Sequence, residues 1–363
     1  MTPPISRRQF TSALALASTA TAMAGPRGLA QATKGDSRIA PYRTPYKYGK
    51  LVLAASGTPG AFDEKSVDDP FVFLHDGKFH MLYIAFDGTG YQTGLARSHD
   101  LVNWDRIGCV AKRDPKSRYT KFNIALACIV RESGLTSPGN AKKVRGRYLG
   151  AWNAYPGAGY EEGAAVIGLA WSDDLLHWEL TEPILFPQDG APWEHGGLYR
   201  PNLLEEDGTF YLYYNAKTDP APASEGGGWH EQSGVATSQD LKTWTRYAGN
   251  PVLRNGPHDS WDARFASNPF VVRHGSEWGM FYFGYDWHSK ARELFALGSD
   301  PYHFTKADEI LIDVGAPGTV DDTFAHKPCT IYHNGVLYHF YCAVSGKWPH
   351  EVRGISVARS KPW

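Results

Sequence analysis

Two adjacent carboxylates stand directly before a proline in the first quarter of the chain, and residues of this type can carry out acid–base chemistry. Asp68 and Asp69 precede Pro70, and the apolar run 71–73 follows. A positioned carboxylate can act as a general base or as a nucleophile. Since successive side chains of a strand point to opposite faces, only one of the two can reach a given pocket directly. We therefore expect one of these aspartates to face a site at the start of a strand.

The same frame, in which a polar residue precedes a proline and an apolar strand follows, occurs at four places. The residues directly before the prolines are Asp69, Arg200, Asn268 and Lys327, and one position further back stand Asp68, Tyr199, Ser267 and His326. Repeats that served only as scaffolding would carry the same residue type at these positions, but here the types differ. The differences predict that these side chains line a shared binding pocket.

A further acidic set lies seven residues before each of the four prolines. Its members are Asp63, Glu194, Asp262 and Asp321, which follow Phe62, Trp193, Trp261 and Val320. The repetition has two interpretations. The acids either tie the incoming segment to the sheet that it joins, or they line the pocket. The second interpretation is stronger for Glu194 and Asp262, because their loops are richer in polar side chains.

The elements that must position these residues are short strands in repeated units. The motif Ser-x-Asp-Leu-x-x-Trp occurs three times, starting at Ser98, Ser172 and Ser238. Each unit reads as four short strands separated by turn residues, and five units follow one another in phase. Strands such as 210–214 are apolar on both faces, as expected for a sheet packed between two others. The pattern predicts an all-β, five-bladed β-propeller with four antiparallel strands per blade over residues 39–363. A pair of β-sandwiches would not produce five units in phase.

The composition sets further limits. The net charge is −1 over 363 residues, which gives no electrostatic case for binding nucleic acid or an anionic membrane. The chain has 12 Trp and 20 Tyr, an aromatic content often found in carbohydrate-binding clefts. Its four cysteines (Cys109, Cys128, Cys329 and Cys342) show no metal-binding spacing and lie in apolar runs, so we expect buried free thiols.

The first 38 residues read as a targeting segment and a linker. A twin-arginine pair, Arg7-Arg8, precedes a small apolar run, and 22–24 fits a small-x-small cleavage site. The run is too short to anchor the chain in a membrane. The segment predicts export of the folded protein to the periplasm or beyond the cell.

These features resemble the five-bladed β-propeller glycoside hydrolases, above all family 43, with relatives in families 32, 62, 117 and 130. The resemblance covers residues 50–363 and rests on the Asp69-Pro70 strand and on the Ser-x-Asp-Leu-x-x-Trp turns. It implies that Asp69 is the catalytic base of a glycosidase, and that no cofactor is required. A Ca²⁺ ion, which some relatives hold in the pocket, is an alternative for which the sequence shows no ligand cluster.

The resemblance leaves two candidates for the proton donor. Family 43 uses a glutamate on a middle blade, for which Glu194 is the nearest residue, and Asp262 is a further acidic candidate. Family 117 uses a histidine on the last blade, and His326 occupies the matching place. A histidine gives up a proton near neutral pH without the large pKa shift that a glutamate needs, so His326 is slightly favoured.

The expected ligand is an oligosaccharide or polysaccharide whose terminal sugar is released. Arg200 and Lys327 would suit an acidic sugar, unless Arg200 only orients a catalytic carboxylate. Asp68, Tyr199 and Asn268 complete the predicted rim. Trp152 and Trp287 lie in aromatic loops suited to stacking on sugars. A glycoside phosphorylase, a polysaccharide lyase and a carbohydrate-binding propeller without catalysis are the alternative functions.

Overall fold

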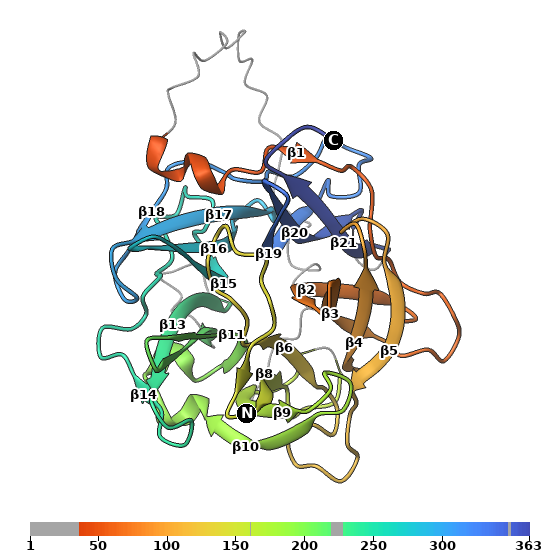
Figure 1. Ribbon diagram of the computed structural model, residues 1–363, viewed down its shortest axis with the longest axis vertical. Helices are drawn as coiled ribbons and strands as arrows, with labels where there is room; N and C mark the ends of the chain where they lie inside the picture. Colours follow the sequence, from red (N-terminus) through yellow and green to blue (C-terminus); the bar gives the residue numbers. More distant parts are fainter. Residues whose placement is uncertain (1–35, 160, 219–227, 348–349) are drawn as a thin grey trace, which may run out of the picture.

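The computed structural model describes residues 36–159, 161–218, 228–347 and 350–363, and these form five four-stranded blades around one axis (Figure 1). The first blade contains β2 (Ser66–His75), β3 (Lys78–Phe86), β4 (Tyr91–Ser98) and β5 (Asp105–Ala111). The second contains β6 (Ala125–Ile129), β8 (Arg147–Ala154), β9 (Val166–Ser172) and β10 (Glu179–Leu185), with the short β7 (Lys143–Val144) beside β8. The predicted fold class is confirmed. The predicted twin-arginine segment lies outside the described residues.

The third and fourth blades follow the same antiparallel order from the inside outward. The third contains β11 (Gly197–Glu206), β12 (Thr209–Thr218), β13 (His230–Ser238) and β14 (Thr245–Arg246). The fourth contains β15 (Phe265–His274), β16 (Glu277–Tyr285), β17 (Ala291–Gly298) and β18 (Phe304–Lys306). Single parallel residue pairs join the third blade to the fourth and the fourth to the fifth.

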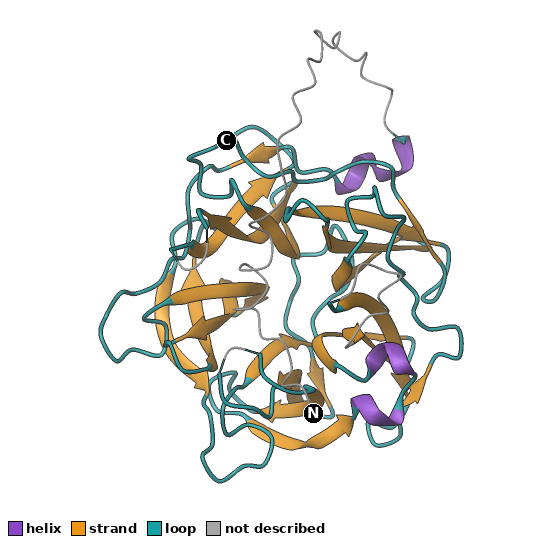
Figure 2. Cartoon of the chain, turned by 180° about the vertical axis from the view of Figure 1, so that it is seen from behind, coloured by secondary structure: helices purple, strands orange, loops and turns teal. Residues whose placement is uncertain are grey.

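The fifth blade closes the ring. It contains β19 (Phe324–His333), β20 (Val336–Ser345) and β21 (Val352–Arg359), and its outermost strand is β1 (Tyr46–Lys47) from the other end of the chain. Helix is confined to three short 3₁₀ segments at the periphery, Ser37–Tyr42, Pro187–Asp189 and Pro192–Glu194 (Figure 2). Among the described residues, no helix is long and apolar enough to cross a membrane.

The Ser-x-Asp-Leu turn has a physical reason to repeat. In the third blade the Ser238 hydroxyl accepts the backbone N–H of Leu241 at 2.8 Å, and Asp240 accepts the N–H groups of the next two residues. The leucine is buried with a φ of 61°, a left-handed conformation that side chains other than glycine rarely adopt. The first two blades build the same turn around Leu101 and Leu175. Serine and aspartate thus satisfy the backbone of a strained corner.

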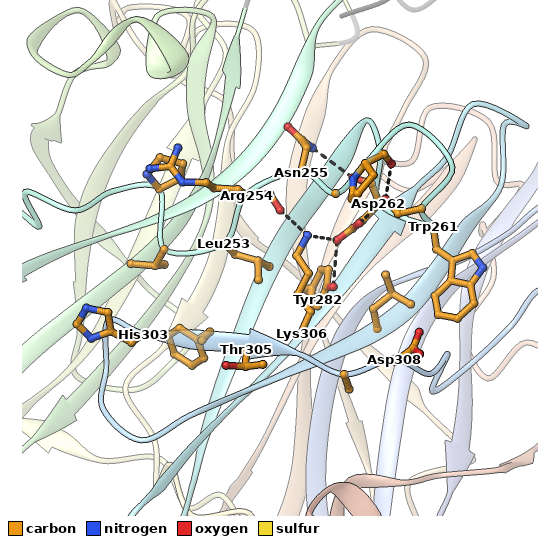
Figure 3. Close-up of a pocket in the computed structure, with 18 of the residues that line it drawn as sticks. Leu253, Arg254, Asn255, Trp261, Asp262, Tyr282, His303, Thr305, Lys306 and Asp308 are labelled. Atoms are coloured by element: carbon orange, nitrogen blue, oxygen red, sulfur yellow. Dashed lines mark hydrogen bonds and ion pairs between the residues drawn. The ribbon is translucent and has the colours of Figure 1, made fainter. Parts of the chain in front are cut away.

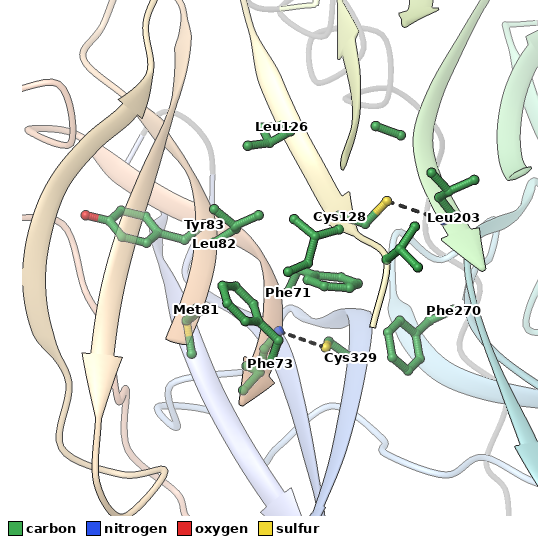
Figure 4. Close-up of a cluster of buried hydrophobic side chains, with 14 of the residues drawn as sticks. Phe71, Phe73, Met81, Leu82, Tyr83, Leu126, Cys128, Leu203, Phe270 and Cys329 are labelled. Atoms are coloured by element: carbon green, nitrogen blue, oxygen red, sulfur yellow. Dashed lines mark hydrogen bonds between the residues drawn. The ribbon is translucent and has the colours of Figure 1, made fainter. Parts of the chain in front are cut away.

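The core near the axis is joined from blade to blade by cysteines (Figure 4). Cys329 accepts the Val72 N–H at 3.1 Å, and Cys128 accepts the Leu203 N–H at 3.3 Å, each across a blade boundary. All four cysteines are free, as predicted, although Cys109 is only half-buried.

An arginine closes one end of the axis. The connection after β6, yellow in Figure 1, crosses the centre of the ring and carries Arg131. The Arg131 guanidinium lies 5.3 Å from the Phe71 ring centroid and 5.2 Å from that of Phe270. It donates to the carbonyls of Val72 and Thr330, from the first and fifth blades. The axial space is therefore a pocket with a floor.

Candidate active site

The four residues before the prolines face the axis because the strand bulges at each of them. Each is the fourth residue of an innermost strand, and each has a positive φ: Asp69 52°, Arg200 53°, Asn268 58° and Lys327 67°. The strand register shifts at every one of these points. Positive φ in residues other than glycine is strained and clusters at functional sites. The bulge, rather than the start of the strand as predicted, aims these side chains inward.

These four side chains are close together and nearly buried. Asp69, Arg200 and Asn268 line one small axial cavity, together with the ring of Pro328. Their exposed fractions lie between 4 and 8%, and Lys327 is the most buried. The sequence prediction that the variable positions meet at one site agrees with this geometry.

The two aspartates are paired with cations. The Asp69 carboxylate contacts the Arg200 guanidinium in a buried ion pair. Asp68 receives Lys327 Nζ at 2.5 Å and Arg353 at 3.0 Å. Burial alone would raise the pKa of Asp68, but the Lys327 and Arg353 charges hold it well below its usual value. Arg200 therefore orients a catalytic candidate, as one of the two interpretations held, although its partner is Asp69 and not Glu194 or Asp262.

His326 lies in this cluster as a neutral ring. Its Nδ1 lies 3.1 Å from the carbonyl of Cys342, and its Nε2 lies 3.4 Å from an Arg353 nitrogen. Burial, followed by the Lys327 charge, lowers the pKa of His326 well below its ordinary value. A neutral imidazole that gives its N–H to a backbone carbonyl has no proton ready for a leaving group. This geometry does not support His326 as the acid.

The acids seven residues before the prolines form four copies of one clasp. In each, the acid accepts a hydrogen bond from a tyrosine twenty residues later on the second strand and an ion pair from the outermost strand of the same blade. The four sets are Asp63 with Tyr83 and Arg106, Glu194 with Tyr214 and Arg246, Asp262 with Tyr282 and Lys306, and Asp321 with Tyr341 and Lys47. Figure 3 shows the copy at Asp262.

This clasp corrects the predicted roles of Glu194 and Asp262. Glu194 is fully buried, with one oxygen 2.7 Å from Tyr214 and the other 2.7 Å from Arg246. Burial raises its pKa, with Tyr214 and Arg246 opposing the rise. Both acids contact the outer strands and not the axis, so the structural interpretation holds for them.

The predicted aromatic contacts differ from one another. Trp152 is 1% exposed and donates its indole N–H to the Leu169 carbonyl, so it belongs to the core and the prediction for it is wrong. Trp287 is half-buried, with the Arg264 guanidinium 4.7 Å from its ring centroid. Tyr199 is buried, and burial followed by the Glu231 charge raises its pKa well above the ordinary value.

Sequence reasoning missed three groups beside the axial layer. Glu231, at the start of β13, accepts the Ser267 hydroxyl at 2.8 Å and the Trp229 indole N–H at 3.1 Å. Lys217 lies 5.1–5.3 Å from the ring centroids of Tyr155, Tyr199 and Trp229, and 3.7 Å from Glu161. Arg353 lies on β21. None of these residues belongs to the repeated frame, so the sequence contains no signal that marks them.

A metal site would have to use Asp68, His326 and Cys342, whose ligand atoms lie within 4.8 Å of one another. These residues do not fit Ca²⁺, which prefers oxygen ligands only. Lys327 and Arg353 also already neutralise Asp68. A further cation here would meet two positive charges.

The comparisons with known proteins agree with this fold. Residues 138–313 match the N-terminal domain of glycosyl hydrolases family 32. A 1,2-beta-oligomannan phosphorylase of Thermoanaerobacter sp. (strain X514) is 27% identical over 157 residues, covering 42% of this chain and 43% of that protein. The chain thus spans less than half the length of that relative.

Solved structures match over most of the chain. A structure described as a complex of BT0996 and RGII is 28% identical with a TM-score of 0.75, covering 90% of this chain and 94% of the other. A structure described as a glycoside hydrolase is 27% identical with a TM-score of 0.74, covering 88% and 93%. Structures from families 43 and 117 are 16% and 15% identical, with TM-scores of 0.57 and 0.60, and share the fold.

Proposed function

The chain belongs to the five-bladed β-propeller superfamily of glycoside hydrolases, and we propose that it hydrolyses the terminal glycosidic bond of a neutral oligosaccharide in the axial pocket. The observation that carries the proposal is the ring of bulged residues, which directs Asp69 and its partner Arg200 into one axial site with a floor. We also propose that the first 38 residues direct export.

Asp69 is the proposed base or nucleophile. The Arg200 guanidinium favours the ionised carboxylate, which is the form that either role requires. Arg200 also fixes the carboxylate by packing around it, since both side chains are less than 10% exposed. Asp68 is excluded from this role by its two cation partners, and it holds Lys327 and Arg353 in place instead.

Glu231 is the proposed proton donor. It is buried, it adjoins the axial layer through Ser267, and its hydrogen bonds from Ser267 and Trp229 come from neutral groups. Arg264 is close enough to interact electrostatically with it. A glycosidase needs such a second carboxyl group beside its base. Glu194 and His326 are replaced in this role because of the contacts described above.

The charge balance of the pocket favours water over phosphate as the attacking group. The 1,2-beta-oligomannan phosphorylase relative makes phosphorolysis the second candidate. However, Arg200 and Lys327 are each neutralised by an aspartate, and Arg353 is shared between Asp68 and Glu351. Phosphate binding needs uncompensated cations or free N–H donors. The same balance favours a neutral sugar over an acidic one.

The activity is tested by incubating the purified protein with candidate oligosaccharides, with and without inorganic phosphate, and identifying the products by mass spectrometry. RGII oligosaccharides are included because of the similar complex, and neutral mannan, xylan and arabinan oligosaccharides complete the set. We expect a free terminal sugar whose yield is independent of phosphate. A sugar phosphate formed only with phosphate would establish the phosphorylase, and an unsaturated product would establish a lyase.

The assigned residues are tested by substitution. Asp69→Asn is expected to lower kcat/KM on the order of a thousandfold or more on every substrate. Glu231→Gln is expected to retain activity on aryl glycosides with acidic leaving groups, which need no proton. Asp63→Asn is the matched control, because it removes a charge from a clasp and should leave kcat/KM unchanged. Equal losses for Asp63→Asn and Asp69→Asn would contradict the assignment.

A further inference from the structure

A second cleft lies between the third and fourth blades, at their outer edge (Figure 3). Its walls are the segment after β14, the segment before β15, and the residues around β18, and it encloses about 890 Å³. Ligand sites commonly measure about 300–1,000 Å³. The cleft is therefore large enough for several sugar units, and it contains none of the axial carboxylates.

The repeated fold provides an internal control for one aromatic residue of this cleft. Trp261 stands at the position held by Phe62, Trp193 and Val320 in the other proline-containing blades. Those three side chains pack against the core, and the Trp193 ring stacks parallel to Tyr214. Trp261 is instead 36% exposed, at the end of the cleft opposite to His303 (Figure 3). The fourth blade has thus exchanged a packing residue for an exposed indole.

A second aromatic surface lies at the other end. The Tyr247 and Tyr302 rings stack with centroids 4.5 Å apart at an angle of 22°. His303 fixes this pair, since its Nε2 lies 3.1 Å from the Tyr247 hydroxyl while its Nδ1 is held by Asp300. Flat, rigid aromatic faces with polar edges suit the apolar faces of sugar rings.

The charges of the cleft favour a neutral ligand. At its base Lys306 is paired with Asp262 at 2.5 Å and also donates to the Arg254 carbonyl, so this ammonium group is neutralised. The exposed residues at the rim include one cation, Arg254, and one anion, Asp308, with the Thr305 hydroxyl nearby. Such a rim offers donors and acceptors to sugar hydroxyl groups without attracting an ion of either sign.

We infer that this cleft is a second saccharide-binding site, which holds a neutral oligosaccharide chain between Trp261 and the Tyr247–Tyr302 pair. It rests on the proposed function only for the choice of a saccharide as ligand. Since its residues are separate from the axial layer, occupation of the cleft would hold a polymer near the enzyme while the axial pocket releases terminal sugars.

The test is ¹⁹F NMR of the full-length protein labelled with 5-fluorotryptophan. A Trp261→Phe variant assigns the Trp261 resonance, and Trp363→Phe serves as the matched control because Trp363 is also exposed but lies at the fifth blade. Short neutral oligosaccharides of mannan, xylan, arabinan and galactan are titrated in turn. We expect at least one of them to shift the Trp261 resonance and to leave that of Trp363 in place.

Two further variants separate this inference from the proposed function. Tyr302→Ala should weaken the saccharide that shifts Trp261 on the order of tenfold, without changing kcat/KM on a short substrate. Asp69→Asn should abolish turnover and leave the Kd at Trp261 unchanged. If no saccharide shifts Trp261, or if the Kd there rises in Asp69→Asn, the second site is refuted. If Trp261 responds but no substrate is hydrolysed, the proposed function falls and the second site stands.

Discussion

Replacing Arg246 by methionine tests the clasp, because it leaves the Glu194 carboxylate buried without its cation. Glu194 is fully buried, and Arg246 contacts it at 2.7 Å. Breaking a buried ion pair by removing one partner costs about 3–5 kcal/mol. Glu194 can avoid this cost only by taking up a proton. The stability of the variant should therefore depend on pH in a way that can be calculated.

The cost of protonation sets the magnitude. It is about 1.36 kcal/mol for each pH unit above the unfolded pKa of roughly 4.3. The penalty at Glu194 is thus limited to about 3.7 kcal/mol at pH 7 and about 1 kcal/mol at pH 5. The folded variant keeps a proton that the unfolded chain releases, so stability falls as pH rises between these values. The lost hydrogen bond from Arg246 to the Phe186 carbonyl adds about 1 kcal/mol at both pH values.

The assay is equilibrium urea unfolding of the wild type and of Arg246→Met at pH 5 and pH 7. We expect the destabilisation to be about 2.7 kcal/mol larger at pH 7. Glu194→Gln in the Arg246→Met background should recover most of that difference. Arg147→Met is the matched control, since its acidic partners Asp173 and Glu179 are 74% exposed, and it should cost less than about 1 kcal/mol at either pH. An equal loss at both pH values for Arg246→Met would refute the reasoning.

Two further predictions concern the axial lysine and the repeated turn. Burial, followed by the Arg200 charge, lowers the pKa of Lys327 to about 8, so Lys327 loses its charge above that pH and leaves Asp68 with Arg353 alone. kcat/KM should therefore fall above about pH 8, and Lys327→Arg should remove this fall; a wild-type profile that is flat to higher pH would contradict it. Ser238→Ala removes the acceptor of the Leu241 N–H and should destabilise the chain by about 1–2 kcal/mol in urea unfolding. Thr243→Ala is the control, because its exposed hydroxyl reaches Asp240 only at 3.4 Å, and an equal effect of the two changes would refute the role of Ser238.

The fold could be predicted from the sequence because its turns have fixed chemical requirements. Ser238 and Asp240 must satisfy the backbone around a left-handed leucine, so the motif recurs wherever a blade makes this corner. The prolines recur because each follows a bulge at the same point of an innermost strand. Local rules of this kind are visible in one sequence.

The site could be predicted only in part, since much of it depends on contacts between blades. Asp69 and Lys327 were found because they belong to the repeated frame, whereas Glu231 and Arg353 reach the axis from third strands, where no repeat marks them. The role of Glu194 could have been read from the sequence, because a tyrosine follows each of the four clasp acids by twenty residues. A role common to all four blades is structural.

The strand that closes the ring also affects the order in which the chain can fold. β1, from residues 46–47, pairs with β21, from residues 352–359, and Lys47 completes the clasp at Asp321. During synthesis the first of these strands must wait, unpaired, until nearly the whole chain has been made. Contacts between residues so far apart in sequence make folding slow. The fifth blade is therefore completed last, and the axial pocket, which takes Lys327 and Arg353 from that blade, cannot form before it.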